Sequence, residues 1–241
     1  MPRGGTAHAS VKTRALLVRR VAYGESDLIL TLLTEELGKV SALARGARRS
    51  QRRFAGALEP MHTLRVALDE RTTSDLYMLR EASIDQARSE LTNSLEALDA
   101  AGRALSWLAR ACVAKTPEPA AWRAISDFLD ELDTRSEPRA PRRALAEFGV
   151  HLLRALGWAL DFEHCVRCGK TCDAGQAAFV DAASGGLICR ACGGARQKLD
   201  GALRARLAAL THSPNGSLDD CDVDAALSLV ENALRAHVGS A

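Results

Sequence analysis

Residues 165–194 read CVRCGKTCDAGQAAFVDAASGGLICRACGG. Within this segment Cys165 and Cys168 form one C-x2-C pair, Cys189 and Cys192 form a second, and twenty residues separate the two pairs. This spacing is typical of a site in which four cysteines bind one zinc ion. Four thiolates would fill every tetrahedral position, so the sequence predicts a single structural Zn²⁺ with no open position for water.

The residues around the cysteine pairs predict a zinc ribbon. Gly169 and Gly193 each follow a pair, where a tight knuckle needs a residue that tolerates positive φ. The runs AAFV and GLIC flank the turn DAASGG and suit two short strands. A set of free buried cysteines is the alternative. Cys172 breaks the pair spacing and is left out of the predicted ligand set.

Helical periodicity borders the cysteine segment on both sides. From about residue 89, apolar and small residues recur at intervals of three and four residues, which predicts one buried helix face. These residues are Leu91, Leu95, Leu98, Gly102, Leu105, Ala109 and Cys112. Further amphipathic helices are predicted over 120–132, 142–160, 195–210 and 223–238.

The first third of the chain has the pattern of short strands. Candidate strands lie at 12–20, 27–34, 39–44, 61–68 and 75–84, each followed by a turn signal. Five strands within about 75 residues, with a long connection between the third and the fourth, suit an OB-fold barrel. An SH3-like barrel fits the same pattern, and the strand pattern does not separate the two.

The predicted fold is therefore of the α+β multidomain class, an OB-fold β-barrel followed by an α-helical domain with an inserted four-cysteine zinc ribbon. We expect a flexible tail over 1–11, the nucleic-acid-binding barrel over 12–86, a first helical part over 87–164, the ribbon over 165–194 and a last helical part over 195–241.

Composition excludes several classes of protein. Of the 241 residues, 47% are hydrophobic and 26% are charged, as in an ordinary globular protein. No segment approaches the 18 or so uncharged apolar residues that a membrane helix needs. The start MPRGGTAHAS has no apolar core and is expected to be a tail rather than a signal peptide, which predicts a cytoplasmic protein. No catalytic motif occurs, so enzyme activity is not expected.

Positive charge is concentrated near the amino end. Residues 1–60 hold 11 Lys and Arg against 5 Asp and Glu, a surplus that the acidic remainder of the chain largely offsets. Five arginines fall within nine residues: Arg45, Arg48, Arg49, Arg52 and Arg53. A solvated surface is the simplest explanation. The position in the longest barrel connection instead favours a phosphate-binding site, because guanidinium groups bind phosphates through paired hydrogen bonds.

Several longer motifs resemble the bacterial RecO family of recombination mediators. They are YGESD (23–27), TEELGKV (34–40), RGARRSQRRFAGALEP (45–60) and FGVHLLRALGWALDFEHC (148–165). The order of barrel, helices, cysteine ribbon and helices is more specific than any single motif. Among the departures, Arg45 stands where the family would have Lys, Gln51 lies near an expected Lys-Ser and Glu59 replaces a usual Gln.

The resemblance implies a non-enzymatic DNA repair and recombination protein of the RecF pathway, associated with the nucleoid. Such proteins bind single-stranded and double-stranded DNA, anneal complementary strands, and act with RecR to load RecA on gaps coated by single-stranded DNA-binding protein (SSB). The implied phosphate contacts fall on Arg45, Arg48 and Arg49. The helpers that the resemblance implies are Arg14, Arg19, Arg20, Arg52 and Arg53. The tail of SSB would contact the helical domain.

Two other functions remain open. A zinc-ribbon regulator would read one nucleic-acid sequence, whereas the mediator would bind unrelated sequences alike. An interaction scaffold would use the basic loop to bind an acidic protein and would not retain DNA. The mediator interpretation also requires that the arginines of the site are not held by the protein's own carboxylates.

Overall fold

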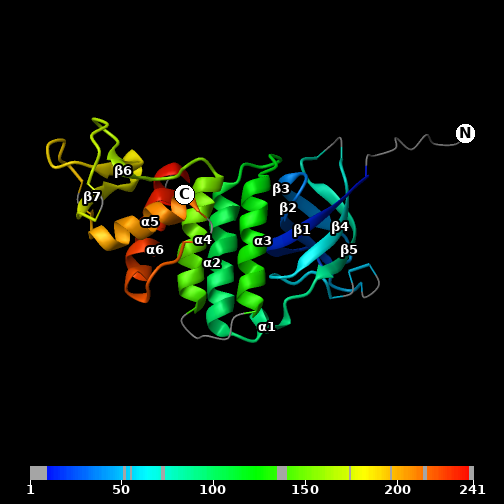
Figure 1. The fold of residues 1–241 in the computed structure, drawn as a ribbon. Helices are drawn as coiled ribbons and strands as arrows, with labels where there is room; N and C mark the ends of the chain where they lie inside the picture. Colours follow the sequence, from blue (N-terminus) through cyan, green and yellow to red (C-terminus); the bar gives the residue numbers. More distant parts are fainter. Residues whose placement is uncertain are drawn as a thin grey trace, which may run out of the picture. The chain divides into compact units, whose positions relative to one another are not determined.

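The computed structural model describes residues 10–50, 53–54, 56–71, 74–134, 140–173, 175–195, 197–213 and 216–238, and Figure 1 shows their elements. The chain divides into two compact units. One contains the chain up to Thr92 together with Cys112–Trp122, and the other contains Asn93–Ala111 and Arg123–Ala241. In the described ranges, none of the helices has the length and apolar character needed to cross a membrane.

The first unit is built on a closed five-stranded barrel, drawn in blue and cyan in Figure 1. Its strands are β1 (Ser10–Tyr23), β2 (Asp27–Thr34), β3 (Gly38–Ala44), β4 (Thr63–Asp69) and β5 (Tyr77–Gln86). They follow the order β1-β2-β3-β5-β4, and β4 pairs with β1 to close the barrel. Only the β3–β5 pair is parallel among these described strands. The OB-fold prediction is confirmed.

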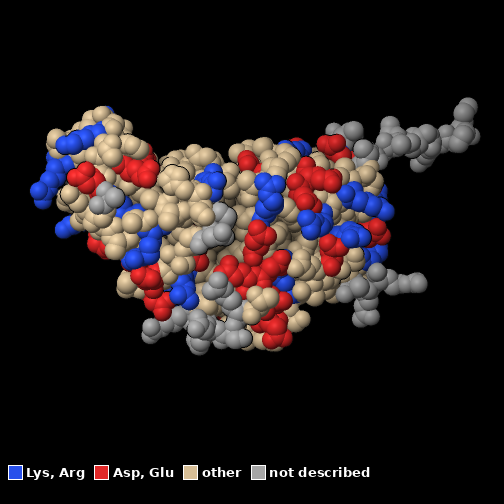
Figure 2. All heavy atoms as spheres, in the orientation of Figure 1, with Lys and Arg blue, Asp and Glu red and all other residues tan. Residues whose placement is uncertain are grey.

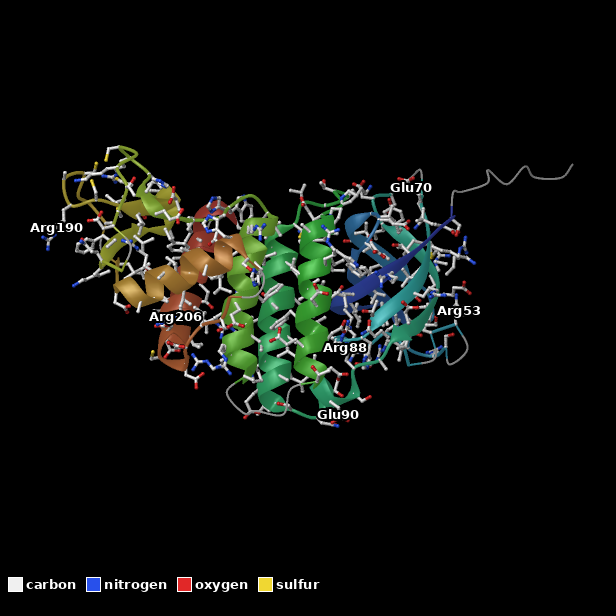
Figure 3. The ribbon with its side chains drawn as sticks, viewed as in Figure 1. Arg53, Glu70, Arg88, Glu90, Arg190 and Arg206 are labelled. Carbon is white, nitrogen blue, oxygen red and sulfur yellow. The ribbon has the colours of Figure 1, made fainter. Side chains whose placement is uncertain are left out.

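Alternation along β4 explains how the barrel interior is filled. Leu64, Val66 and Leu68 all face the core and are at most 1% exposed, as the period-two pattern predicts. Thr63 is also buried, although it belongs to the other face of the strand. Ala67 and Asp69 on that face are buried too, and Thr63 Oγ1 accepts a hydrogen bond at 3.0 Å from Nη1 of the buried Arg88 (Figure 3).

The segment Cys112–Trp122 belongs to the barrel unit although it follows a helix of the second unit. The N–H of Lys115 donates to the carbonyl of Lys39 at 2.9 Å, next to an isolated β-bridge. Gly38 permits this approach, because its φ is +67° and a Cβ there would lie 2.0 Å from the Thr116 carbonyl oxygen. Only glycine fits this position without a shift of the backbone.

The described residues form six α-helices. They are α1 (Ser89–Thr92), α2 (Leu95–Ala111), α3 (Pro119–Thr134), α4 (Ala140–Ala155), α5 (Gly201–His212) and α6 (Val223–Val238). In the second unit α2 and α6 both pack against α4. Gly149 of α4 lies so close to α6 that a Cβ would be 2.6 Å from Val230 Cγ1.

The buried face of α2 differs from the predicted one. Leu95, which the spacing placed on the buried face, is 78% exposed. Alanines such as Ala97, Ala101 and Ala104 are buried instead. Leu105 is buried as predicted, but Trp107 and Leu108 are buried as well, so the buried face of α2 is rotated from the predicted one and includes several alanines.

The cysteine segment forms part of a four-stranded sheet in the order β6-β8-β7-β9. The strands are β6 (Asp161–Cys165), β7 (Ala178–Asp181), β8 (Gly186–Ile188) and β9 (Gln197–Leu199), with short 3₁₀ helices η1 (Ala182–Ser184) and, before α6, η2 (Asp220–Asp222). β7 and β8 pair antiparallel across the DAASGG turn, as the ribbon pattern predicts. β6 and β9 extend the sheet on both sides.

Two predicted helix ends are wrong because cap residues make both helices shorter than the periodicity indicates. The helix predicted to reach residue 160 ends at Ala155, since Gly157 adopts φ +75° and its N–H donates back to the Arg154 carbonyl at 3.0 Å. The helix predicted from residue 195 begins at Gly201. There the Asp200 carboxylate accepts the Leu203 N–H at 2.8 Å, which is an N-cap.

Candidate nucleic-acid interface and metal centre

The three arginines that are the main predicted phosphate contacts follow the end of β3 at Ala44, whereas Arg14, Arg19 and Arg20 lie on β1. We call residues 45–50 the arginine turn and residues 23–27, between β1 and β2, the hairpin tip. Arg45, Arg48 and Arg49 in the arginine turn are all exposed. Their side chains are therefore accessible to a ligand.

Hydrogen bonds hold the arginine turn against the hairpin tip. The N–H of Gly46 donates to Asp27 Oδ1 at 2.8 Å, and the N–H of Arg48 donates to the Ser26 carbonyl at 3.0 Å. The Arg48 side chain also donates from Nη1 to the Glu25 carbonyl at 3.3 Å. The backbone beneath the guanidinium groups is thus fixed before any ligand binds.

Two of the predicted helpers are held by the protein's own carboxylates. Arg14 forms a two-pronged ion pair with Glu35, with N–O distances of 2.8 and 2.9 Å. This hydrogen bonding lowers the pKa of Glu35. Arg20 donates from Nη1 to Glu59 Oε1 at 2.6 Å and to the Leu58 carbonyl at 2.9 Å. Each guanidinium would have to break or share these bonds to bind a phosphate.

The arginines of the turn are less constrained. Arg49 lies 3.7 Å from the Glu25 carboxylate, but the two side chains are 74% and 92% exposed, so solvent screens the pair. Arg19 and Arg45 form no side-chain ion pair within the described residues. On β1, Arg14 and Arg20 are held by carboxylates, whereas at the arginine turn the one ion pair among the described residues is the long, exposed contact between Arg49 and Glu25.

The last two members of the set occupy the segment after the turn. Arg53 donates from Nη2 to the Arg45 carbonyl at 2.5 Å, and its guanidinium lies 5.1 Å from the centre of the Phe54 ring. It thereby supports the backbone of the arginine turn while remaining exposed. Arg52 lies outside the described residues.

Arg19 and Arg20 lie on opposite faces of β1, and a bulge in the strand decides which of them faces inward. The pairing of β1 with β2 shifts register between Leu17 and Arg19, after which Arg20 lies opposite Leu30. Residues opposite each other in a ladder share a face, and Leu30 belongs to the barrel core. Arg20 therefore lies on the inner side at the barrel mouth and Arg19 on the outer side.

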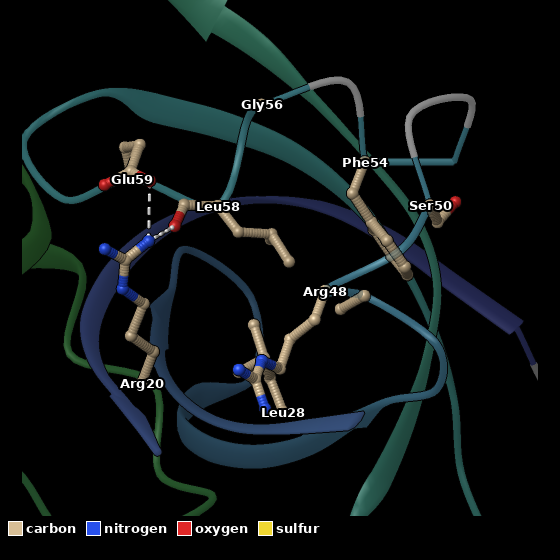
Figure 4. A pocket seen from close by; sticks show the side chains of 9 residues that line it. Arg20, Leu28, Arg48, Ser50, Phe54, Gly56, Leu58 and Glu59 are labelled. Carbon is tan, nitrogen blue, oxygen red and sulfur yellow. Dashed lines mark hydrogen bonds and ion pairs between the residues drawn. The ribbon is translucent and has the colours of Figure 1, made fainter. Parts of the chain in front are cut away.

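An open cavity of about 400 Å³ lies at this mouth (Figure 4). Its lining is apolar at Leu28, Phe54 and Leu58 and charged at Arg20 and Arg48. The remaining lining residues are Ala47, Ser50, Gly56 and Glu59. The cavity joins the arginine turn to β1. On the face seen in Figure 2, acidic and basic groups alternate over the barrel, so the positive charge there is local.

The four predicted metal ligands come together at the two knuckles. The sulfur atoms of Cys165, Cys168, Cys189 and Cys192 all lie within 4.8 Å of one another. The Cys168 and Cys189 sulfurs are 3.7 Å apart, too far for a disulfide at roughly 2.05 Å. A tetrahedral metal with metal–sulfur bonds of about 2.3 Å requires sulfur–sulfur edges of about 3.8 Å. The donor set therefore fits a four-coordinate thiophilic ion.

The thiols of this cluster influence one another. The Cys189 N–H donates to Cys165 Sγ at 3.3 Å, and this bond is the main cause that lowers the pKa of Cys165 to about 6. The pKa of Cys192 is raised to about 12. The larger cause is hydrogen bonding with the Cys189 side chain, and the neighbouring sulfurs raise it further. Opposite shifts are expected where thiolates repel one another at short range. A bound cation would relieve that repulsion.

The two knuckles have the predicted glycine turns, and a hydrogen bond between them that the sequence did not predict. Gly169 and Gly193 adopt φ +72° and +60°, as the tight turns require. Arg167 of the first knuckle donates from Nη1 to the Gly193 carbonyl of the second at 2.9 Å, and so joins the two. Arg190 instead points away from the sheet in Figure 3 and is exposed.

A second group with metal-ligand atoms, Asp219, Cys221 and Asp222, lies near the start of α6. The Asp222 carboxylate already accepts a hydrogen bond from Arg206 Nε at 2.6 Å, and Asp219 lies 3.0 Å from the same guanidinium. Arg206 therefore supplies the positive charge that a metal would otherwise provide.

Sequence reasoning missed some residues that position both sites. Asp27 fixes the arginine turn, and its place beside a glycine turn is the signal that could have indicated this. Arg204 of α5 is 4% exposed and donates from Nη2 to the Cys172 carbonyl at 3.0 Å, which ties the ribbon to α5. No pattern in the sequence distinguishes Arg204 from a solvated helical arginine.

Comparison with known proteins identifies the family. The family models described as Recombination protein O N terminal and Recombination protein O C terminal match residues 9–88 and 90–241. A DNA repair protein RecO from Anaeromyxobacter sp. (strain K) is 39% identical over 209 residues, 86% of this chain and 80% of the relative. A RecO protein from Geobacter metallireducens is 36% identical, and the match covers 76% of this chain and 73% of the relative. A RecO protein from Myxococcus xanthus is 35% identical, and the match covers 74% of this chain and 71% of the relative. The chain therefore belongs to the RecO family of DNA repair proteins.

Proposed function

We propose that this DNA repair protein is a recombination mediator that binds single-stranded and double-stranded DNA largely through phosphate contacts. It anneals complementary strands and acts with RecR to load RecA on gaps coated by SSB. The observation that carries the proposal is the arginine turn, in which Arg45, Arg48 and Arg49 are exposed on a backbone fixed by the hairpin tip.

Phosphate binding follows from the chemistry of this turn. Each exposed guanidinium offers paired N–H donors to the oxygens of a phosphate and displaces the counterions that surround DNA. Arg53, beside the turn, and Arg19, on the outer face of β1, add positive charge, and Arg52, which lies outside the described residues, is a further candidate. Arg14 and Arg20 contribute only if DNA competes with Glu35 and Glu59, so we rank them below the turn.

Annealing needs no residue that makes or breaks a covalent bond. Two DNA strands repel each other through their phosphates, and a cationic surface that holds both lowers this repulsion so that base pairs can nucleate. The three guanidinium groups of the turn supply the charge. We therefore expect no turnover chemistry, and the SSB tail and RecR would contact other surfaces, the SSB tail on the helical unit.

The four-cysteine centre is proposed to hold one Zn²⁺. Cys165, Cys168, Cys189 and Cys192 would bind the ion, and the ion would supply a cross-link between the two knuckles. With all four positions filled by sulfur, the site has a structural role. A mediator that works on chromosomal gaps would act in the cytoplasm at the nucleoid.

A salt titration tests the proposal. Annealing of two complementary oligonucleotides and binding of a single strand are measured from 50 to 400 mM potassium chloride, with and without SSB. The proposal expects both to weaken steeply with salt and to vary little among unrelated sequences. Strong preference for one sequence would favour a zinc-ribbon regulator, and failure to retain DNA at low salt would favour an interaction scaffold.

A further inference from the structure

The barrel unit exposes a single aromatic ring among its described residues. Tyr23 is 56% exposed, whereas Phe54, Tyr77 and Trp122 are 2%, 7% and 3% exposed. Exposed apolar residues are common on protein surfaces, so exposure alone does not define a site. The position of Tyr23 does distinguish it.

Tyr23 is the last residue of β1 and pairs with Asp27 across the hairpin tip. The same Asp27 accepts the Gly46 N–H at 2.8 Å, and the next residue back, Ser26, accepts the Arg48 N–H at 3.0 Å. The tyrosine is therefore mounted on a rigid element directly linked to the arginine turn. Because the backbone that carries the ring is already ordered, stacking of a ligand on the ring costs little backbone entropy.

The bulge in β1 decides which way this ring faces. Ala22 lies opposite Leu28, which packs against the barrel core, so Tyr23 lies on the outer face together with Val21 and Arg19. Arg19 is four residues away, about 13 Å along an extended strand. In the described ladders β4 pairs with β1 only as far as residue 16, so β4 does not cover this stretch.

We infer that Tyr23 is a stacking platform for one unpaired DNA base, with Arg19 on one side and Arg48 on the other binding the flanking phosphates. The inference rests on the proposed function, since it adds a base contact to the phosphate contacts. Every base has a flat π-face that can stack on an aromatic ring, but in a duplex both faces are covered by neighbouring bases. Tyr23 therefore favours single-stranded over double-stranded DNA, while the arginines bind both.

The test compares Tyr23→Ala and Tyr23→Phe with the wild-type chain on a single-stranded oligonucleotide, the matching duplex, and a single strand carrying one 2-aminopurine. We expect Tyr23→Ala to lose roughly 5- to 150-fold in single-strand affinity, the range that a stacked base contributes. Duplex affinity should change by less than about twofold, and the slope of log K against log salt should stay the same, because no phosphate contact is lost. Quenching of 2-aminopurine by the wild type should be absent in Tyr23→Ala and retained in Tyr23→Phe.

Several outcomes would overturn the inference: unchanged single-strand affinity in Tyr23→Ala, an equal loss on single strand and duplex, or a Tyr23→Phe variant as weak as Tyr23→Ala. Leu95→Ala, which truncates another exposed apolar side chain outside the barrel unit, is the control and should bind as the wild type does. Failure of the phosphate assignment has a different signature, since replacing the turn arginines would then leave the salt slope unchanged whatever Tyr23 does.

Discussion

Replacing Arg45, Arg48 and Arg49 by alanine is the most direct test of the phosphate contacts. The structure predicts that these three contribute more than Arg14 or Arg20, because none of them is in a close ion pair with a carboxylate. Each phosphate contact on a single strand contributes roughly 0.7 to the slope of log K against log salt. Losing three contacts should therefore flatten the slope by about 2.

That change in slope has a measurable consequence. Between 50 and 200 mM salt, the wild-type chain should lose roughly 20-fold more affinity than the triple variant loses over the same range. Fluorescence anisotropy with a labelled single strand at five or six salt concentrations gives the slope for each protein. Thermal unfolding of both proteins confirms that the variant is folded before the comparison is made.

A matched control separates the arginine turn from total charge. Arg65, Arg80 and Arg142 are also exposed, but each is held in an ion pair, with Asp85, Asp69 and Asp224. Their joint replacement by alanine removes the same three positive charges and should leave the slope within about 0.5 of the wild type. Equal slopes in the two triple variants would refute the assignment of phosphate binding to the turn.

Three further perturbations follow from individual side chains. Cys165→Ser should reduce metal content from about one ion per chain to near zero by elemental analysis and lower the melting temperature, while DNA binding persists below that temperature. Burial raises the pKa of Cys112 to about 11 from an ordinary 9.0, so the native thiol should resist iodoacetamide at pH 8 while the exposed Cys221 reacts. Because the unfolded thiol ionises at lower pH than the folded one, the free energy of unfolding should fall as pH rises from 9 towards 11, measured by denaturant titration. Glu59→Gln should release Arg20, increase single-strand affinity and steepen the salt slope by up to about 0.7; an unchanged slope would show that Arg20 does not reach DNA.

The features that were predictable from sequence are those specified by short-range patterns. The four ligands at Cys165, Cys168, Cys189 and Cys192 are two close pairs, and the two knuckles bring them together in the structure. The barrel strands were predictable because turns and alternation mark each one. The buried face of α2 was not, because alanine carries too little hydrophobic signal to stand out against leucine.

Charge pairing lay beyond sequence reasoning because it depends on distant contacts. Arg14 and its partner Glu35 are 21 residues apart, and Arg20 and Glu59 are 39 apart. The register of the β1–β2 hairpin brings Arg14 beside Glu35, and folding of the chain after β3 brings Glu59 to Arg20. Strand alternation places Arg19 and Arg20 on opposite faces, and the bulge after Leu17 decides that Arg20 is the one that faces inward.

The distribution of paired and unpaired arginines bears on how the free protein and its complex differ in energy. The ion pairs of Arg14 and Arg20 offset charge on the strands, whereas among the described residues the three positive charges of Arg45, Arg48 and Arg49 are offset only by the exposed Glu25, 3.7 Å from Arg49. Hydrogen bonds from the turn to Asp27 and Ser26 fix the backbone of the turn, so the loop does not move its positive charges apart. A phosphate that binds there relieves the repulsion as well as adding its own hydrogen bonds. The charges that destabilise the free turn are thus the ones from which DNA binding gains most.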